Sequence, residues 1–138
     1  DPGGKLVEKI SKIKDVKIVP IPGPSSLTAT ASVCGFPMER FVFLGFPPKK
    51  RKRKKFFEEV LSKDYPVIFF ESPHRILKTL KELKEVFEKK NKKADLVVCR
   101  ELTKMYESIY RGGFNDVLEK PFTQSDIEQL IEKWFLLK

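Results

Sequence analysis

Apolar residues along this chain form short continuous runs, separated by stretches in which they recur every three or four positions. The runs predict buried strands, and they lie at residues 16–21, 41–46, 66–71 and 94–100, with a shorter one at 107–112. The stretches between the runs predict helices. Strands that alternate with helices are typical of an α/β domain, here a layered sheet of about five mostly parallel strands with flanking helices.

The helix with the clearest pattern follows the third strand, where apolar residues at i, i+4, i+7 and i+11 share one face: Ile76, Leu80, Leu83 and Phe87. An opening helix is predicted around residues 6–13, a helix of small residues from Ser26 to Gly35, and another around residues 56–61. A final helix is predicted from the apolar face formed by Ile127, Leu130, Ile131, Trp134 and Phe135.

Polar or turn-forming motifs follow each of the first four predicted strands. They are PGPSS (22–26), GFPPKK (45–50), ESPHR (71–75) and RELTK (100–104). In open α/β sheets, ligands bind in the crevice beyond the carboxyl ends of the strands. The four motifs therefore predict one functional edge.

The only histidine of the chain lies in ESPHR. Ser72 and Pro73 fit the cap and first turn of the following helix. Arg75 fits that position poorly, because a cation opposes the helix macrodipole there, so a carboxylate or phosphate partner is expected. Glu71 is the internal candidate for this partner and a nucleic-acid phosphate is the external one; the residues alone leave both open.

PGPSS and RELTK also have two interpretations each. PGPSS either only caps a helix through Ser25 or Ser26, or accepts part of a ligand against exposed amides. RELTK is either a loop ion-pair network or a group of charges that aligns a polyanionic substrate.

The net charge of +9 is concentrated in one run, because residues 49–55 (KKRKRKK) carry seven positive charges. Such a cluster predicts a polyanionic partner such as nucleic acid, since phosphates neutralised by cations release counterions; a solvated loop is the alternative. Cys34 and Cys99 match no metal-ligand spacing and predict two reduced thiols in a cytosolic protein without a metal site. No apolar run approaches the roughly 20 residues of a membrane helix.

In their order along the chain, the motifs DPG, VPIPGPSS, GFP, RFVFLGFPP, FESPHR and RELTK resemble the ribosomal RNA small subunit methyltransferase I family. That family belongs to the tetrapyrrole (corrin/porphyrin) methylase superfamily. The resemblance runs from residue 1 to about residue 119. PGPSS with GFP is shared widely in the superfamily, whereas FESPHR and RELTK are much more specific to its RNA-methylating branch.

The resemblance implies an enzyme that transfers a methyl group from S-adenosylmethionine to the ribose 2′-oxygen of a cytidine in 16S ribosomal RNA. It implies a cytoplasmic homodimer whose subunits have two domains, with the cofactor in the cleft between them. Cofactor contacts are then expected from Pro22, Gly23, Pro24, Ser25, Ser26, Phe70 and Leu102. RNA contacts are expected from Lys49, Lys50, Arg51, Lys52, Arg53, His74 and Arg100.

The catalytic candidates at the predicted edge are Glu71, Arg75, Glu101 and Lys104. Methyl transfer to a hydroxyl needs alignment of oxygen, methyl and sulfur, and the hydroxyl proton must leave. A carboxylate or a neutral amine could take that proton. The sequence does not choose between Glu71, Glu101 and Lys104 for this role.

By this resemblance, residues 1–120 correspond to the C-terminal domain of the family, and the glycine-rich N-terminal domain is missing from the sequence. Residues 121–138 are expected to form a helix where family members carry an apolar strand. The chain alone is then expected to be inactive without the other half of the cofactor cleft. Two alternatives are a catalytically silent RNA-binding module and a tetrapyrrole methylase-like protein; the basic run and ESPHR argue against the second.

Overall fold

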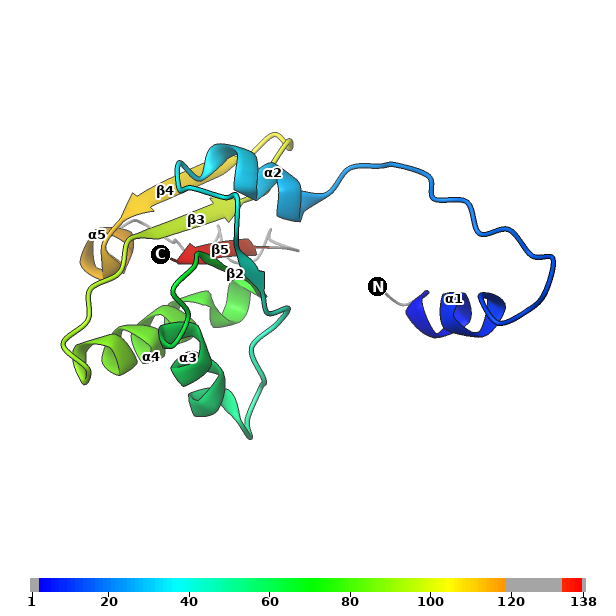
Figure 1. Cartoon of the computed structure of the whole chain (residues 1–138). Coiled ribbons are helices and arrows are strands. Elements are labelled where there is room, and N and C mark those ends of the chain that lie inside the picture. Colours follow the sequence, from blue (N-terminus) through cyan, green and yellow to red (C-terminus); the bar gives the residue numbers. More distant parts are fainter. Residues whose placement is uncertain (1–2, 119–132, 138) are drawn as a thin grey trace.

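The computed structural model of the chain describes residues 3–118 and 133–137. A five-stranded sheet in the order β1-β2-β5-β3-β4 forms its centre (Figure 1). The strands are β1 (Val42–Phe43), β2 (Val67–Glu71), β3 (Leu96–Arg100), β4 (Ser108–Gly112) and β5 (Lys133–Leu137). The helices are α1 (Gly4–Ile10), α2 (Ser26–Val33), α3 (Arg53–Leu61), α4 (Ile76–Glu88) and α5 (Phe114–Leu118), with a 3₁₀ turn, η1 (Pro73–Arg75), before α4.

The two faces of the sheet build two separate apolar clusters, because successive side chains of a strand point to opposite faces. Phe69 and Val98 face the cluster that α3, α4 and α5 cover. Val97 and Cys99 face the smaller cluster at the C-terminal end of α2, which includes Cys34. The molecule is therefore a three-layer α/β sandwich, as the alternation of strands and helices predicted.

Helix α4 forms where its apolar spacing predicted it. Ile76, Leu80 and Leu83 are fully buried and Phe87 is nearly so. Fully burying a Leu or Ile side chain contributes about 1.5–3 kcal/mol, so this one face anchors the helix firmly to the sheet.

The prediction of a mostly parallel sheet is wrong. Only β1 and β2 pair in parallel, while β2–β5, β5–β3 and β3–β4 are antiparallel. β5, which lies between β2 and β3, accounts for two of these antiparallel pairs, and the neighbouring strands β3 and β4 form the third. β2 and β3 still run in the same direction, and Glu71 and Arg100 are both in register with Lys133, so the carboxyl ends of β2 and β3 lie at the same edge of the sheet.

Two predicted elements need correction. Residues 16–21 have no regular secondary structure and are exposed, Ile21 to 91%. A strand exists only with a hydrogen-bonding neighbour, and this segment leads away from the sheet to α1 (Figure 1). The predicted final helix is wrong at residues 133–137, which form β5; residues 121–132 and 138 lie outside the described part of the chain. A short apolar run fits either a strand or a buried helix.

Candidate functional site

The motifs that follow β1, β2 and β3 meet at one edge, as predicted. Phe70 donates its N–H to the carbonyl oxygen of Gly45 at 2.7 Å, so the backbone after β1 stays beside the end of β2. The register of β2 and β3 against β5 places ESPHR and RELTK at the same position along the strand direction. The fourth motif, PGPSS, does not follow a strand of the sheet, but it reaches this edge through α2.

A hollow of about 650 Å³ lies between the PGPSS turn and the loop after β3. It is lined by residues from the turn, from one face of α2 and from the loop: Gly23, Pro24, Ser25, Ser26, Thr28, Ala29, Ser32, Leu102 and Thr103. Five of the predicted cofactor residues line it, while Pro22 and Phe70 do not. The ring of Phe70 instead packs against Phe43 at 4.6 Å and Phe46 at 5.3 Å.

Sequence reasoning missed Thr28, Ala29, Ser32 and Thr103 as lining residues. The signal was present in α2, because residues 25, 28, 29 and 32 recur at helical spacing and are all small. A face of small side chains leaves room for a ligand beside the helix.

The walls of the hollow are fixed by local hydrogen bonds. Ser25 caps α2, because its Oγ accepts a hydrogen bond from the Thr28 N–H at 3.5 Å. The Thr28 hydroxyl donates in turn to the Ser25 carbonyl oxygen at 3.0 Å. On the other wall, Glu101 and Thr103 both adopt left-handed backbone conformations, with φ of 45° and 65°. Such residues each store about 1–3 kcal/mol of strain, which is typical of loops held for a function.

The hollow fits a nucleoside-type cofactor such as S-adenosylmethionine in size and in chemistry. Small-molecule sites span about 300–1,000 Å³ and combine apolar walls with a few polar groups. Here the hydroxyl-bearing residues Ser25, Ser26 and Thr28 line the same space as the apolar Ala29 and Leu102. None of its lining side chains is an acid or a base, so proton transfer would fall to neighbours such as Glu101 or Lys104.

Glu71 is enclosed in a network of charges at the end of β2. Its carboxylate is fully buried, accepts hydrogen bonds from the Ser72 N–H (2.7 Å) and the Thr79 hydroxyl (2.6 Å), and forms ion pairs with Arg75 (2.7 Å) and Arg53 (3.6 Å). The internal interpretation of Arg75 is therefore the one that the geometry supports. A carboxylate occupied on every side is poorly placed to accept a substrate proton, which corrects the choice of Glu71 as a candidate base.

Arg75 retains one free donor in this arrangement. Its Nη2 pairs with Glu71 and its Nε donates to the Ser72 hydroxyl at 3.1 Å. Its Nη1 is buried and has no hydrogen-bond partner among the described residues. Because this atom is shielded from solvent, Arg75 holds Glu71 in this arrangement and reaches a ligand at the edge only if its side chain moves.

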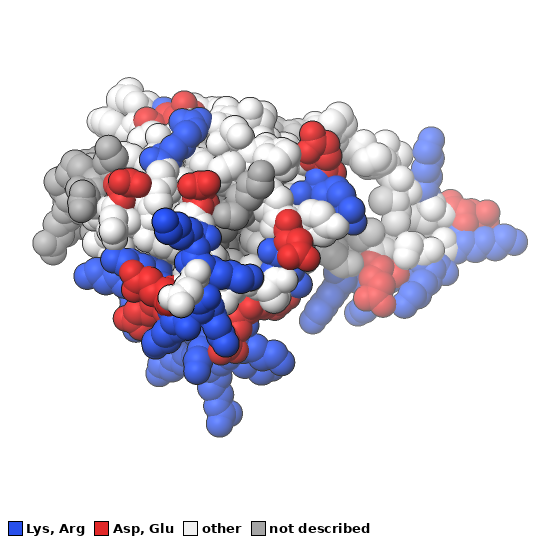
Figure 2. Space-filling model, turned by 60° about the vertical axis from the view of Figure 1, so that its left-hand side comes forward, with Lys and Arg blue, Asp and Glu red and all other residues white. Residues whose placement is uncertain are grey.

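The basic run divides into an exposed loop and one inward residue. Lys49, Lys50, Arg51 and Lys52, here called the basic loop, are exposed, and Figure 2 shows Lys and Arg side chains crowded on one part of the surface. Arg53 is buried and donates to the Pro48 carbonyl, Thr79 and Glu82, which corrects its assignment as an RNA contact.

The remaining predicted residues differ in exposure. His74 and Lys104 are exposed, Glu101 is half-buried, and Arg100 is buried at the end of β3. His74 is therefore accessible to a large ligand in this structure, whereas Arg100 is not.

Both cysteines are buried and free. Burial raises the pKa of the Cys99 thiol to about 11. Cys99 is therefore a neutral core side chain on the α2 face of the sheet and lies outside the chemistry of the edge.

The family model for tetrapyrrole (corrin/porphyrin) methylases matches residues 1–117. The chain belongs to this family. A methyltransferase structure, that of CobJ, superposes with a TM-score of 0.59 at 16% identity, over 96% of this chain and 55% of that one. At that identity the likeness concerns the fold alone.

Curated relatives bear the name predicted from the motifs. The chain is 32% identical over 118 residues to the ribosomal RNA small subunit methyltransferase I of Thermotoga maritima, covering 86% of this chain and 51% of the relative. It is 36% identical over 129 residues to that of Hydrogenobaculum sp., covering 93% and 54%. The predicted family resemblance is confirmed, and the chain spans about half the length of these relatives. Among the described residues, no helix has the length and hydropathy required to cross a membrane.

Proposed function

We propose that this chain is the C-terminal half of an S-adenosylmethionine-dependent methyltransferase that modifies the ribose 2′-hydroxyl of a cytidine in small-subunit ribosomal RNA. The observation that carries the proposal is the hollow, because it joins PGPSS and RELTK beside a charged edge. The names of the relatives support the RNA substrate.

The residues that line the hollow are proposed to bind the cofactor and to fix its position for methyl transfer. The cofactor, when bound, supplies the electrophilic methyl group. Ser25, Ser26 and Thr28 would hold its polar groups, and Leu102 would cover an apolar face. Because methyl transfer depends on in-line geometry, the rigid turn and the strained loop contribute by fixing the position of what they bind.

Two side chains next to the hollow are proposed for proton removal. Lys104 and Glu101 lie in the loop that carries Leu102, and the Lys104 N–H donates to the Glu101 carbonyl at 2.9 Å. Arg75, whose side chain is 25% exposed, is proposed to orient the RNA phosphate or ribose. His74 and the basic loop add contacts to the RNA backbone, which position the substrate without reading its sequence.

The test uses the full gene product that contains this sequence, incubated with small ribosomal subunits and methyl-labelled cofactor. We expect 2′-O-methylcytidine in nucleoside digests of the RNA. Ser26→Tyr, which fills the hollow, should abolish labelling, while Ser62→Tyr on the exposed end of α3 should not. Lys104→Ala should lower turnover without lowering thermal stability.

Two outcomes would contradict the proposal. Cofactor binding without methylated RNA would favour a silent RNA-binding module, and methylation of a base in place of a ribose would change the assigned chemistry. The 138-residue chain alone is expected to bind cofactor more weakly than 1 μM (about −8 kcal/mol) in calorimetry. Sedimentation of the gene product checks the proposed homodimer, and cell fractionation checks the proposed cytoplasmic location.

A further inference from the structure

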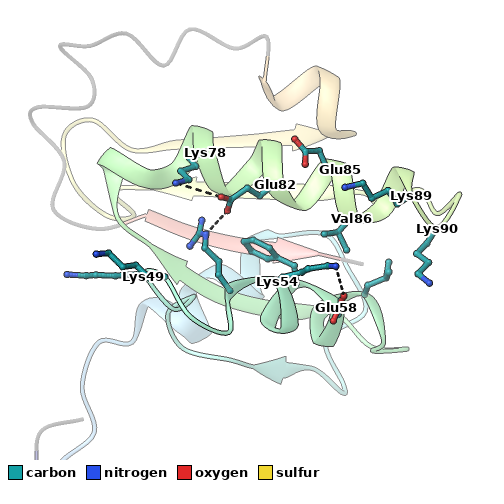
Figure 3. A pocket seen from close by; sticks show the side chains of 13 residues that line it. Lys49, Lys54, Glu58, Lys78, Glu82, Glu85, Val86, Lys89 and Lys90 are labelled. Carbon is teal, nitrogen blue, oxygen red and sulfur yellow. Dashed lines mark hydrogen bonds and ion pairs between the residues drawn. The ribbon is translucent and has the colours of Figure 1, made fainter.

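A groove of about 590 Å³ runs between α3 and α4, on the side of the sheet that α2 does not cover (Figure 3). It begins at Lys49 and Lys50 of the basic loop and ends at Lys89 and Lys90, just past α4. The groove is separate from the hollow, with which it shares no lining residue. The proposed function uses only its basic-loop end, Lys49 and Lys50.

The lining of this groove is strongly cationic. Seven Lys and Arg side chains line it against three carboxylates, an excess of four positive charges. Two of the carboxylates are already matched, because Glu82 pairs with Arg53 and Lys78, and Glu58 pairs with Lys54.

The two ends of the groove carry its free charges. Lys49, Lys50, Lys89 and Lys90 are exposed and form no ion pair with the described residues. Uncompensated cations at both ends of a groove favour an extended anion over a compact one.

The floor of the groove is apolar. Leu61 and Val86 are half-buried, and Phe57 lies beneath them at 2% exposure. Proteins that bind single-stranded nucleic acid combine a positive groove for the backbone with apolar or aromatic surface for bases. A lipid surface would need exposed apolar residues at the rim, whereas the apolar residues here are half-buried or buried.

The groove has the length and the direction of a nucleic-acid track. From Lys78 to Lys90 the helical rise of 1.5 Å per residue gives about 18 Å, a length that spans several successive nucleotides of a single strand. Both helices begin at the functional edge, where Arg53 ties the start of α3 to Glu71 at the end of β2. The groove therefore leads outward from the edge.

We propose that this groove binds the phosphate backbone of a single RNA strand that leads away from the functional edge. The identity of the ligand as RNA rests on the proposed function. The groove extends the RNA contact from the basic loop to Lys78, Lys89 and Lys90, which sequence patterns did not single out.

The experiment measures binding of a 5′-fluorescein-labelled 20-nucleotide RNA to the 138-residue chain by anisotropy, between 50 and 300 mM salt. The groove variant carries Lys78→Gln, Lys89→Gln and Lys90→Gln. The matched control removes the same charge at exposed lysines outside the groove, with Lys14→Gln, Lys17→Gln and Lys81→Gln. A double variant limited to residues 89 and 90 breaks no ion pair and guards against loss of folding.

We expect the groove variant to lower the log–log salt slope by about 2, because each phosphate contact on a single strand contributes about 0.7. The dissociation constant at 100 mM salt should rise at least 10-fold, and the double variant should show about two thirds of the change in slope. The control should change the slope by less than 0.5. Equal slopes for groove and control variants would overturn the proposal, as would binding of phosphatidylserine vesicles by a chain that does not bind RNA.

The failures of the two proposals are distinguishable. If the gene product methylates ribosomal RNA and the groove substitutions have no effect on RNA binding, the groove proposal is refuted and the proposed enzymatic function stands. If RNA binding depends on the groove but no methylation occurs, the proposed enzymatic function is refuted and the groove proposal stands.

Discussion

Substituting Glu71 with glutamine removes the charge from a carboxylate that is fully buried and held by four partners. Glutamine has nearly the same shape, so packing is preserved. Its amide offers one acceptor oxygen in place of two, and its NH₂ group would face a guanidinium. The substitution therefore tests the charge network and not the volume of the site.

The expected loss of stability depends on which partners Arg53 and Arg75 keep after the substitution. Removing one member of a buried ion pair costs about 3–5 kcal/mol, because the other charge stays buried without compensation. Arg53 keeps Glu82 as a partner, and the Arg75 side chain is 25% exposed and can be solvated in part. Both facts reduce the penalty, and we expect a loss of about 3 kcal/mol, a large share of the roughly 5–15 kcal/mol typical of a domain.

Urea unfolding at pH 7, followed by far-UV circular dichroism, measures this loss. Glu82→Gln is the matched control, because its side chain is 31% exposed and we expect a loss of about 1 kcal/mol or less. If Glu71→Gln changed the free energy of unfolding by less than 0.5 kcal/mol, our estimate of the network's contribution would be wrong.

Two other predictions concern the backbone and the thiols. Gly112 has φ of 145°, and an added Cβ would lie 2.7 Å from the Cβ of Asp116, so Gly112→Ala should destabilise the chain by about 2 kcal/mol in urea while Gly4→Ala, which meets nothing within 4 Å, should not. The raised pKa of Cys99, about 11 against 9.0, means that the unfolded chain ionises first as pH rises. Stability should therefore fall between pH 9 and 11, by at most about 2.7 kcal/mol. Cys99→Ala should lack this part of the fall, and parallel stability curves for the two proteins would contradict the assignment.

The sequence predicted those parts of the fold whose signal is local. The buried runs became β2, β3 and β4, and the periodic face of α4 is buried as expected. Pairing partners are not local, so the insertion of β5 between β2 and β3 could not be predicted from its own residues. Residues 16–21 show the same limit, because an apolar run becomes a strand only where another strand pairs with it.

The sequence predicted where the functional edge lies, but not which of its residues stabilise the fold and which are available to a ligand. Seven consecutive cations give no hint that Arg53 alone turns inward, since only the fold brings Glu71 and Thr79 to it. Glu71, expected as a catalytic candidate, joins the starts of α3 and α4 to the end of β2 through Arg53 and Arg75. The groups proposed for proton removal, Glu101 and Lys104, lie on the other side of β5, in the loop after β3.

This division makes the two sides of the edge separable by experiment. The network at Glu71 holds Arg53, and Arg53 is bonded to the Pro48 carbonyl, which immediately precedes the basic loop. Weakening the network should therefore loosen the basic loop and the start of the groove together, although Glu71 lines neither the groove nor the hollow. Loss of Lys104, which is exposed and outside the network, should leave both in place. A substitution that reduces stability and RNA affinity in parallel thus acts through the network, whereas one that reduces turnover alone acts at the hollow.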